Sequence, residues 1–231
     1  MKERVSVGYG TLPVLFVAPH GHYLDDSNTA ELTVAAAEAI DANYVVNRGW
    51  RRDTKVDQIA SRANCNDFRH CQEDVVREEF LNPINETISD AYSAMGDDLI
   101  IICVHGMGNG IRAQANAPKL GVVVGYGEGK PPLYTCDKWV HECFVDLMNA
   151  NVCETWEGAP GGQFSARGKN NMTQVLRQHG TQCLQVEIVY AYRDTAKNAE
   201  KFGRDLGLAV KELMKYDASY GRSITQLVRC I

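Results

Sequence analysis

The stretch Leu99-Ile100-Ile101-Ile102-Cys103-Val104, which ends at His105, decides how this sequence folds. Its six consecutive apolar residues lack the alternation of a strand with one wet face, so they predict a strand covered on both faces. Such strands occur in parallel sheets that lie between layers of helices. In these sheets ligands bind beyond the carboxyl ends of the strands, which makes the residue after the run as informative as the run itself.

Strand and helix patterns alternate on both sides of this run. Further strands are predicted over 12–18, 44–46, 120–124 and 183–189, and helices over 28–40, 72–95, 138–149, 170–178 and 195–214. Asn28 is interpreted as the N-cap of the first helix, with Glu31 three residues further on, and Pro83 is expected to kink the second. The alternation predicts an α/β protein: a three-layer α/β/α sandwich with a mixed, largely parallel sheet of phosphorylase/hydrolase-like type, in a single domain over 1–231.

Composition narrows the classes of function. The chain has 231 residues, of which 45% are hydrophobic and 23% charged, as in ordinary globular proteins. Its net charge of −5 gives no electrostatic reason to expect binding to nucleic acid or to an anionic membrane surface. The longest apolar runs, 12–19 and 99–104, are too short to cross a bilayer, and the first residues lack the apolar core of a signal peptide. We therefore expect a cytoplasmic protein with no nucleic-acid or membrane partner.

Eight cysteines raise the question of a disulfide framework or a structural zinc site. No two of them form a Cys-x-x-Cys pair. Two clusters with a histidine match no structural zinc spacing, namely Cys65/His70/Cys71 and Cys136/His141/Cys143. Free, buried thiols in a reducing compartment are the favoured interpretation.

Two of the six histidines directly follow apolar runs, where a ligand site is expected. His20 follows the run 14–19, His105 follows the run 99–104, and a glycine comes after each. A single such histidine is commonly explained by a hydrogen bond within a loop, but two at matching positions favour a metal site. Asp25 and Asp26 lie just beyond His20, so a loop can bring a carboxylate to the same ion. Two imidazoles and one carboxylate leave a fourth position open for water, whose pKa a catalytic zinc ion lowers.

Glu187 is the candidate catalytic group. In the predicted strand 183–189, the apolar residues at 184, 186 and 188 share one face, while Gln185 and Glu187 share the other. A carboxylate in a buried strand is costly unless it is paired or functional. The structural interpretation is an ion pair with an arginine such as Arg193. The functional interpretation is a general base that acts on metal-bound water and is tuned by burial.

Arginines supply candidates for substrate binding. They crowd the segment after the second predicted strand, at positions 48, 51, 52, 62 and 69, and Arg167 lies in the glycine-rich loop 158–168. A guanidinium can bind a carboxylate through two parallel hydrogen bonds, although most arginines of a charged segment face water. Arg48, Arg69 and Arg167 are the candidates for holding a small anionic substrate, and the glycines around Arg167 favour it because they allow a close approach of the backbone.

Four motifs occur in order along the chain: Ala18-Pro19-His20-Gly21, Val104-His105-Gly106-Met107, Gly161-Gly162-Gln163-Phe164-Ser165-Ala166-Arg167 and Leu184-Gln185-Val186-Glu187-Ile188. With them the chain resembles the N-formylglutamate amidohydrolase family and the related poly-gamma-glutamate hydrolases, whose architecture is similar to that of zinc carboxypeptidases. The resemblance implies that His20, Asp25 and His105 bind zinc. It also implies that Glu187 is the catalytic glutamate and that Arg167 contacts the substrate.

Three departures from the family pattern bear on the site. His22 stands where these families have a small residue, so it crowds the pocket or serves as an extra ligand. Asp25 is shorter than the glutamate of the poly-gamma-glutamate hydrolases, which leaves Asp26 as a rival ligand. The family's Asp-Leu-Asn-Arg-like segment has its nearest counterpart in 64–69, which adds Asn66 to Arg69 as a substrate-binding candidate.

These features predict a hydrolase with one zinc ion per chain, which cleaves an amide bond of an N-acyl (N-formyl) or gamma-glutamyl amino acid. An esterase with the same site is an alternative, since the same activated water serves both reactions. A non-catalytic protein that binds a metal or ligand on the same scaffold is a second alternative. Sites made of histidine and carboxylate also accept manganese or iron.

Overall fold

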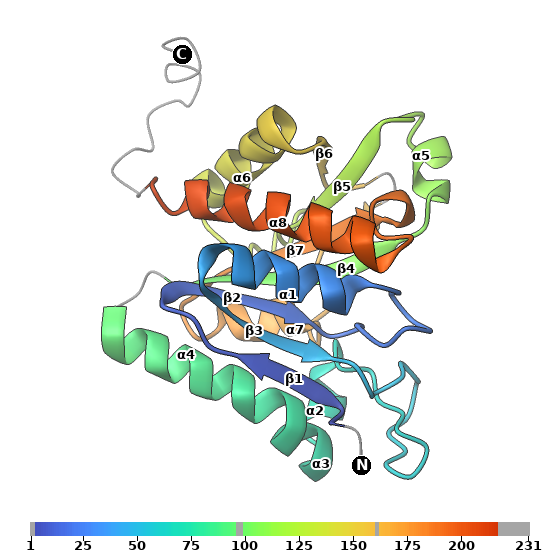
Figure 1. Ribbon diagram of the computed structural model, residues 1–231, viewed down its shortest axis with the longest axis vertical. Helices are drawn as coiled ribbons and strands as arrows, with labels where there is room; N and C mark the ends of the chain where they lie inside the picture. The colour runs from blue at the N-terminus through green and yellow to red at the C-terminus, as the bar shows by residue number, and fades with distance from the viewer. Residues whose placement is uncertain (1–2, 96–98, 160–161, 217–231) are drawn as a thin grey trace.

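A seven-stranded mixed sheet organises the protein (Figure 1). The computed structural model describes residues 3–95, 99–159 and 162–216. In chain order the strands are β1 (Val5–Gly8), β2 (Leu12–Ala18), β3 (Ala42–Asn47), β4 (Ile100–Met107), β5 (Leu120–Gly125), β6 (Glu154–Glu157) and β7 (Gln182–Val189). Their order in the sheet is β1-β3-β2-β4-β7-β5-β6.

The four central strands run parallel and place their carboxyl ends at one edge. β2 pairs in parallel with β3 and β4, and β4 pairs in parallel with β7. β1 is antiparallel to β3, and the parallel pair β5–β6 is joined to β7 in antiparallel orientation. The prediction of a mixed, largely parallel sheet is therefore confirmed. Because β2, β4 and β7 end at the same edge, the residues that follow or close them are neighbours.

Helices cover both faces of the sheet and complete the three layers (Figure 1). One face packs against α1 (Thr29–Ile40), α6 (Lys138–Asn151) and α8 (Ala196–Leu213). The other packs against the segment α2 (Phe68–Cys71), α3 (Asp74–Val76), a π-helical turn η1 (Arg77–Leu81) and α4 (Asn82–Met95), and against α7 (Met172–Arg177). A short helix α5 (Gly110–Gln114) follows β4, and a 3-10 turn η3 (Tyr190–Tyr192) follows β7.

The periodicity of the sequence decides which side chains enter which layer. In β2, Val14 and Phe16 lie in the core under α1 and α8, while Leu15 and Val17 lie in the core on the α4 side. α8 lies close against α1 because it presents Gly203 and Gly207, where an added Cβ would come within 2.2 and 2.3 Å of backbone carbonyl oxygens of α1. The apolar runs of the sequence are therefore buried on both faces, as predicted.

Several predicted details differ from the structure. β1 and β6 have only four residues each and no apolar run, so the pattern did not predict them. Asn28 does precede α1, but it adopts a left-handed conformation, and its side-chain amide donates to the carbonyl of Arg193 at 2.7 Å instead of capping the helix. The irregularity expected near Pro83 is the π-helical turn η1, which ends just before that proline.

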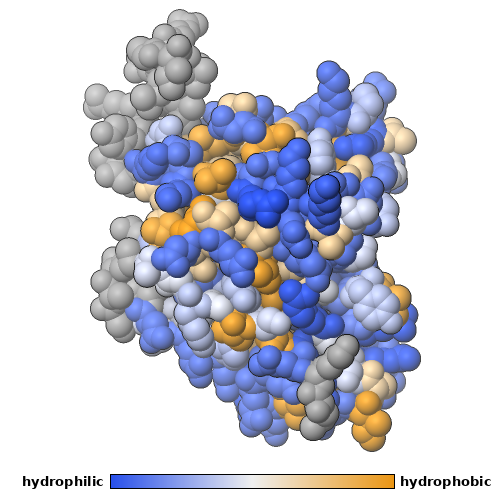
Figure 2. All heavy atoms as spheres, viewed as in Figure 1, coloured by the Kyte–Doolittle hydropathy of each residue, from blue (hydrophilic) through white to orange (hydrophobic). Residues whose placement is uncertain are grey.

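The hydropathy of the surface and the state of the cysteines follow the expectations drawn from the sequence. The face that α1 and α8 form is hydrophilic over much of its area, with apolar side chains scattered among charged ones (Figure 2). Within the three described ranges, no helix combines the length and hydropathy needed to cross a membrane. Seven cysteines are described, and all are free and buried, as predicted. Cys230, Pro160 and Gly161 lie outside the described residues.

Candidate metal centre

His20, Asp26 and His105 form a buried group at the carboxyl edge of the sheet. His20 and Asp26 belong to the loop after β2, and His105 lies near the end of β4. Each side chain offers one ligand atom, and these atoms lie within 4.8 Å of one another. Oδ2 of Asp26 lies 3.5 Å from Nδ1 of His20 and 3.7 Å from Nδ1 of His105. Among the described residues this is the one set of three or more histidine, cysteine and acidic side chains with such spacing.

Neighbouring groups fix the orientation of these side chains. The backbone N–H of Gly106 donates to Oδ2 of Asp26 at 3.0 Å. Nε2 of His20 lies 2.8 Å from the amide oxygen of Asn64, an acceptor, so Nε2 carries the proton. Nδ1 of His20 is the nitrogen that faces Asp26. An outer partner of this kind sets the tautomer of metal-binding histidines.

The electrostatics favour a cation between the three side chains. Burial alone would raise the pKa of Asp26, but the adjacent imidazoles of His105 and His20 outweigh it and hold that pKa well below its usual value. Burial lowers the pKa of His105, against the opposing effect of Asp26, so this imidazole stays neutral at pH 7. A carboxylate and neutral imidazoles are the protonation states that bind metal.

The carboxylate of the group belongs to Asp26 and not to Asp25, the residue predicted first. Asp25 accepts a hydrogen bond from the backbone N–H of Arg52 at 2.6 Å through Oδ2, which holds its carboxylate in the loop. The predicted position of Asp25 in the group is therefore corrected to its rival Asp26. His22 also stays outside the group: its Nδ1 accepts from the backbone N–H of Leu24 at 3.2 Å.

Glu187 lies beside this group, on the neighbouring strand. It is the register partner of His105 in the parallel pair β4–β7, and both side chains are buried. Oε1 of Glu187 accepts a hydrogen bond from Nε2 of Gln185 at 3.0 Å. Burial, followed by the negative charge of Asp26, raises the pKa of Glu187 to about 8. The predicted alternation is confirmed, because the apolar residues at 184, 186 and 188 belong to the core on the opposite face.

The alternative role for Glu187, an ion pair with Arg193, does not occur between these two described residues. The guanidinium of Arg193 is buried and donates to three backbone carbonyls, those of Ile188 (3.1 Å), Ser27 (2.7 Å) and Met107 (3.2 Å). It therefore joins the loop after β2 to the ends of β4 and β7. Its positive charge still opposes the rise in the pKa of Glu187.

The predicted substrate-binding residues lie at different places. Arg48 forms an ion pair with Glu31 on α1 at 2.6 Å, so its charge is already paired on the outer surface of that helix. Arg167 donates to the carbonyl of Pro131. Arg69 is exposed and pairs with Asp67 through two nitrogens.

Asn66 has a structural contact as well. Its backbone carbonyl accepts from the N–H of Met172 at 3.2 Å, where α7 begins. None of these four contacts joins a predicted substrate-binding side chain to the buried group. The residue of the 64–69 segment that does touch the group is Asn64, which the sequence did not single out.

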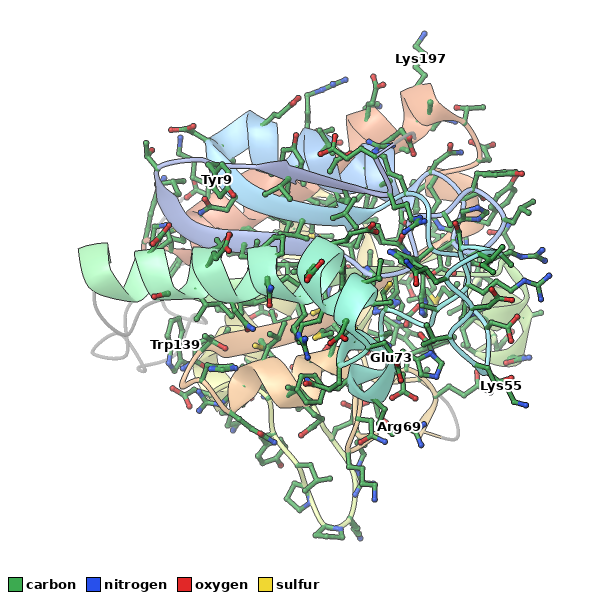
Figure 3. All side chains as sticks on the ribbon, turned by 90° about the horizontal axis from the view of Figure 1, so that it is seen from below. Tyr9, Lys55, Arg69, Glu73, Trp139 and Lys197 are labelled. Carbon is green, nitrogen blue, oxygen red and sulfur yellow. The ribbon has the colours of Figure 1, made fainter. Side chains whose placement is uncertain are left out.

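Open hollows lie along the segment that carries Asn64, and one of about 370 Å³ is lined by Asn64, Asn66, Asp67 and residues 168–171. A hollow of about 530 Å³ is lined by Arg52, Asp53, Thr54, Asn64, Asp67, Arg69 and His70. A larger one, of about 620 Å³, shares Thr54, Arg69 and His70 with it but extends away from Asn64, toward Trp50 and α3. Asn64, which contacts His20, borders the hollows of about 530 and 370 Å³. Figure 3 shows Lys55, Arg69 and Glu73 together on this side, with Tyr9 and Trp139 toward the opposite one.

The residues present fit a divalent metal ion. Two imidazoles and one carboxylate are the donor set of catalytic zinc sites. Nε2 of His105 is buried and has no hydrogen-bond partner among the described residues. A cation held by these three side chains would balance the buried negative charge of Asp26.

The fold and this site define an α/β protein with a histidine–carboxylate centre at the carboxyl edge of its sheet, and known structures share the fold. N-formylglutamate amidohydrolase from Ralstonia eutropha JMP134 matches with a TM-score of 0.59, over 93% of this chain and 98% of that chain, at 12% identity. Bacteriophage poly-gamma-glutamate hydrolase matches with a TM-score of 0.55, over 95% and 90%, at 14% identity. A zinc-free apo form of the protein YNDL matches with a TM-score of 0.51, over 94% and 90%, at 14% identity.

These likenesses confirm the predicted resemblance at the level of the fold. No protein-family model matches the sequence, and no curated protein matches it.

Proposed function

We propose that this protein is a metal-dependent hydrolase that cleaves an amide bond of an N-acyl or gamma-glutamyl amino acid. The observation that carries the proposal is the buried group His20–Asp26–His105 with Glu187 on the neighbouring strand. The protein shares its fold with an N-formylglutamate amidohydrolase and a poly-gamma-glutamate hydrolase, and this likeness supports the choice of an amide bond.

Three residues would hold the metal: His20 and His105 through ring nitrogens, and Asp26 through its carboxylate. A divalent ion in this position supplies Lewis-acid polarisation of a carbonyl oxygen and lowers the pKa of water. Zinc suits two imidazoles and one carboxylate, and we propose about one zinc ion per chain. Asn64 and the backbone N–H of Gly106 would keep these ligands oriented while the substrate enters and leaves.

Glu187 would act as the general base. Gln185 occupies Oε1, so Oε2 is the oxygen left to accept the proton of the attacking water. A base is most effective when its pKa lies near the working pH, and burial brings the pKa of Glu187 from the acidic range to about 8. A cation held by the neighbouring ligands would favour the ionised form of Glu187, because opposite charges stabilise each other.

The experiment that tests the proposal compares the wild type with Glu187→Gln. Both are assayed for metal content and for hydrolysis of N-formyl amino acids, gamma-glutamyl peptides and the corresponding esters. Glu187→Gln should keep its metal, because Glu187 is not a ligand, and should lose about 10²- to 10⁴-fold in kcat. Full activity of the variant would show that Glu187 is not the base. A metal-loaded wild type inert toward the whole panel would favour the non-catalytic alternative, and turnover of esters alone would favour the esterase.

A further inference from the structure

Gln185 contacts the proposed general base directly. It lies two positions before Glu187 on β7, so the two side chains are on the same face of the sheet. Both are buried, with exposed fractions of 4% and 6%. Nε2 of Gln185 donates to Oε1 of Glu187 at 3.0 Å and to the carbonyl of Phe164 at 3.3 Å. A reversed amide would place an oxygen against both acceptors, so the orientation of this amide decides what Glu187 meets.

Asn171 holds the oxygen end of the Gln185 amide. It is the N-cap of α7, and its Oδ1 accepts a hydrogen bond from the backbone N–H of Thr173 at 2.8 Å. A backbone N–H can only donate, so Oδ1 is the atom that faces the helix and Nδ2 is the atom left for Gln185. Nδ2 of Asn171 donates to Oε1 of Gln185 at 3.0 Å. With its oxygen engaged in this way, Gln185 presents its nitrogen to Glu187.

The backbone of the loop 162–168 requires the same orientation. The carbonyl of Phe164 can only accept, so the nitrogen of Gln185 faces it. Phe164 and Ala166 have φ values of 62° and 56°, left-handed conformations that are uncommon for residues with a side chain and that cluster at functional sites. Gly125, the register partner of Gln185 on β5, leaves room for this carbonyl, because an added Cβ there would overlap the carbonyl oxygen.

Two backbone groups therefore determine which oxygen of Glu187 is free. The N–H of Thr173 and the carbonyl of Phe164 both direct the nitrogen of Gln185 toward Oε1 of Glu187. Oε1 is an acceptor in this arrangement, so a proton carried by Glu187 belongs on Oε2. In the proposed reaction an O–H bond of the attacking water breaks: its proton goes to Oε2, and its electron pair forms the bond to the carbonyl carbon.

We propose that Gln185, oriented by Asn171 and by the Phe164 carbonyl, is a positioning residue that reserves Oε2 of Glu187 for the proton of the attacking water. This inference rests on the proposed function, which makes Glu187 the base. It gives the cap of α7 and the loop 162–168 a part in the reaction, although neither supplies a side chain to the buried group of His20, Asp26 and His105.

The test compares two variants with the wild type on the member of the panel above that the wild type hydrolyses fastest. Gln185→Met keeps the length of the side chain but removes its amide. Asn171→Asp keeps the oxygen that caps α7 but offers Gln185 only an acceptor, so the amide should turn its oxygen toward Glu187. Each variant should lower kcat about 10- to 100-fold, because the base is misplaced, while KM changes by less than about threefold and the zinc content stays the same.

Gln174→Met is the matched control. Gln174 lies on α7, and its Nε2 donates to the carbonyls of Leu133 at 2.7 Å and Ala166 at 2.8 Å. This variant therefore loosens the same loop without removing a hydrogen bond of Gln185, and its kcat should stay within about twofold of the wild type. Three results would overturn the inference: an equal loss in Gln174→Met and Gln185→Met, wild-type kcat in Gln185→Met, or loss of zinc from Gln185→Met.

Hydrogen exchange of the Gln185 side-chain amide gives a readout that does not depend on turnover. In ¹⁵N-labelled protein its signals are assigned by their absence from Gln185→Met. They should exchange with solvent at least about tenfold more slowly than those of the exposed Gln58, because both N–H groups are buried and bonded. Equally fast exchange would overturn the inference. A protected amide in a wild type that hydrolyses no member of the panel would contradict the proposed function and leave the orientation of Glu187 by Gln185 standing.

Discussion

The carboxylate of Asp26 accepts a hydrogen bond from the backbone N–H of Gly106 at 3.0 Å, and this contact joins the loop after β2 to the end of β4. The same oxygen lies between the Nδ1 atoms of His20 and His105. The two histidines come from segments that are 85 positions apart in the sequence. The parallel pairing of β2 with β4 brings them together, and the backbone of Gly106 fixes the carboxylate between them.

Asn64 should contribute to metal affinity without being a ligand. Asn64→Ala removes the acceptor for Nε2 of His20, so the ring is free to rotate and to change tautomer. We expect the affinity for zinc, measured by competition with a chelator, to fall about 10- to 100-fold. Asn66→Ala is the control, because the side chain of Asn66 faces the start of α7 and does not contact His20. Equal zinc affinities of the wild type and Asn64→Ala would contradict this role.

Gly106 should be required for the packing of Arg193. A Cβ at position 106 would lie 2.2 Å from the guanidinium carbon of Arg193, whose three backbone hydrogen bonds prevent it from moving away. Gly106→Ala should lower the free energy of unfolding by about 1–3 kcal/mol, measured by urea denaturation. Gly108→Ala is the matched control, since a Cβ there meets no atom within 4 Å. If both variants unfold at the same urea concentration as the wild type, the packing of Arg193 does not depend on position 106.

Glu187 should make the stability of the metal-free protein depend on pH. Its pKa is about 8 in the folded protein and near the ordinary value for glutamate, 4.5, in the unfolded chain. Between these values the folded state keeps a proton that the unfolded state has released, so the free energy of unfolding falls as the pH rises. Glu187→Gln has no such group. It should therefore gain stability relative to the wild type from pH 5 to pH 8, by on the order of a few kcal/mol.

This pH dependence is measured by urea denaturation of both proteins in the presence of a chelator. Parallel curves of unfolding free energy against pH would show that Glu187 ionises normally in the folded state. The wild type and the variant should have similar stability below pH 4.5, where the carboxyl group is protonated in both the folded and the unfolded chain.

The fold and most of the buried group could be predicted from the sequence because they depend on local patterns. The apolar run of β4 and the alternation of β7 predicted which side chains lie at the carboxyl edge, and both histidines are there. The choice between Asp25 and Asp26 could not be predicted, because both occur in the same polar loop. It depends on which backbone N–H group each carboxylate meets: that of Arg52 for Asp25, and that of Gly106 for Asp26.

Contacts between residues that are far apart in the sequence could also not be predicted from its local patterns. Asn64 is 44 positions from His20, and neither its residue type nor its neighbours in sequence indicate that it accepts a hydrogen bond from an imidazole. The roles of the arginines depend on ion pairs with Glu31, Asp53 and Asp67, which form only once the chain is folded. The short strands β1 and β6 lie at the edges of the sheet, where four residues suffice for pairing.

The metal content of Asp26→Asn and Asp25→Asn, measured by plasma mass spectrometry beside the wild type, tests the candidate centre most directly. The wild type should hold about one zinc ion per chain, and Asp25→Asn should hold the same amount. Asp26→Asn should lose the metal, as should His105→Ala, while circular dichroism shows that each variant is folded. Zinc retained in folded Asp26→Asn but lost from Asp25→Asn, or a wild type that takes up no metal after reconstitution, would contradict the account.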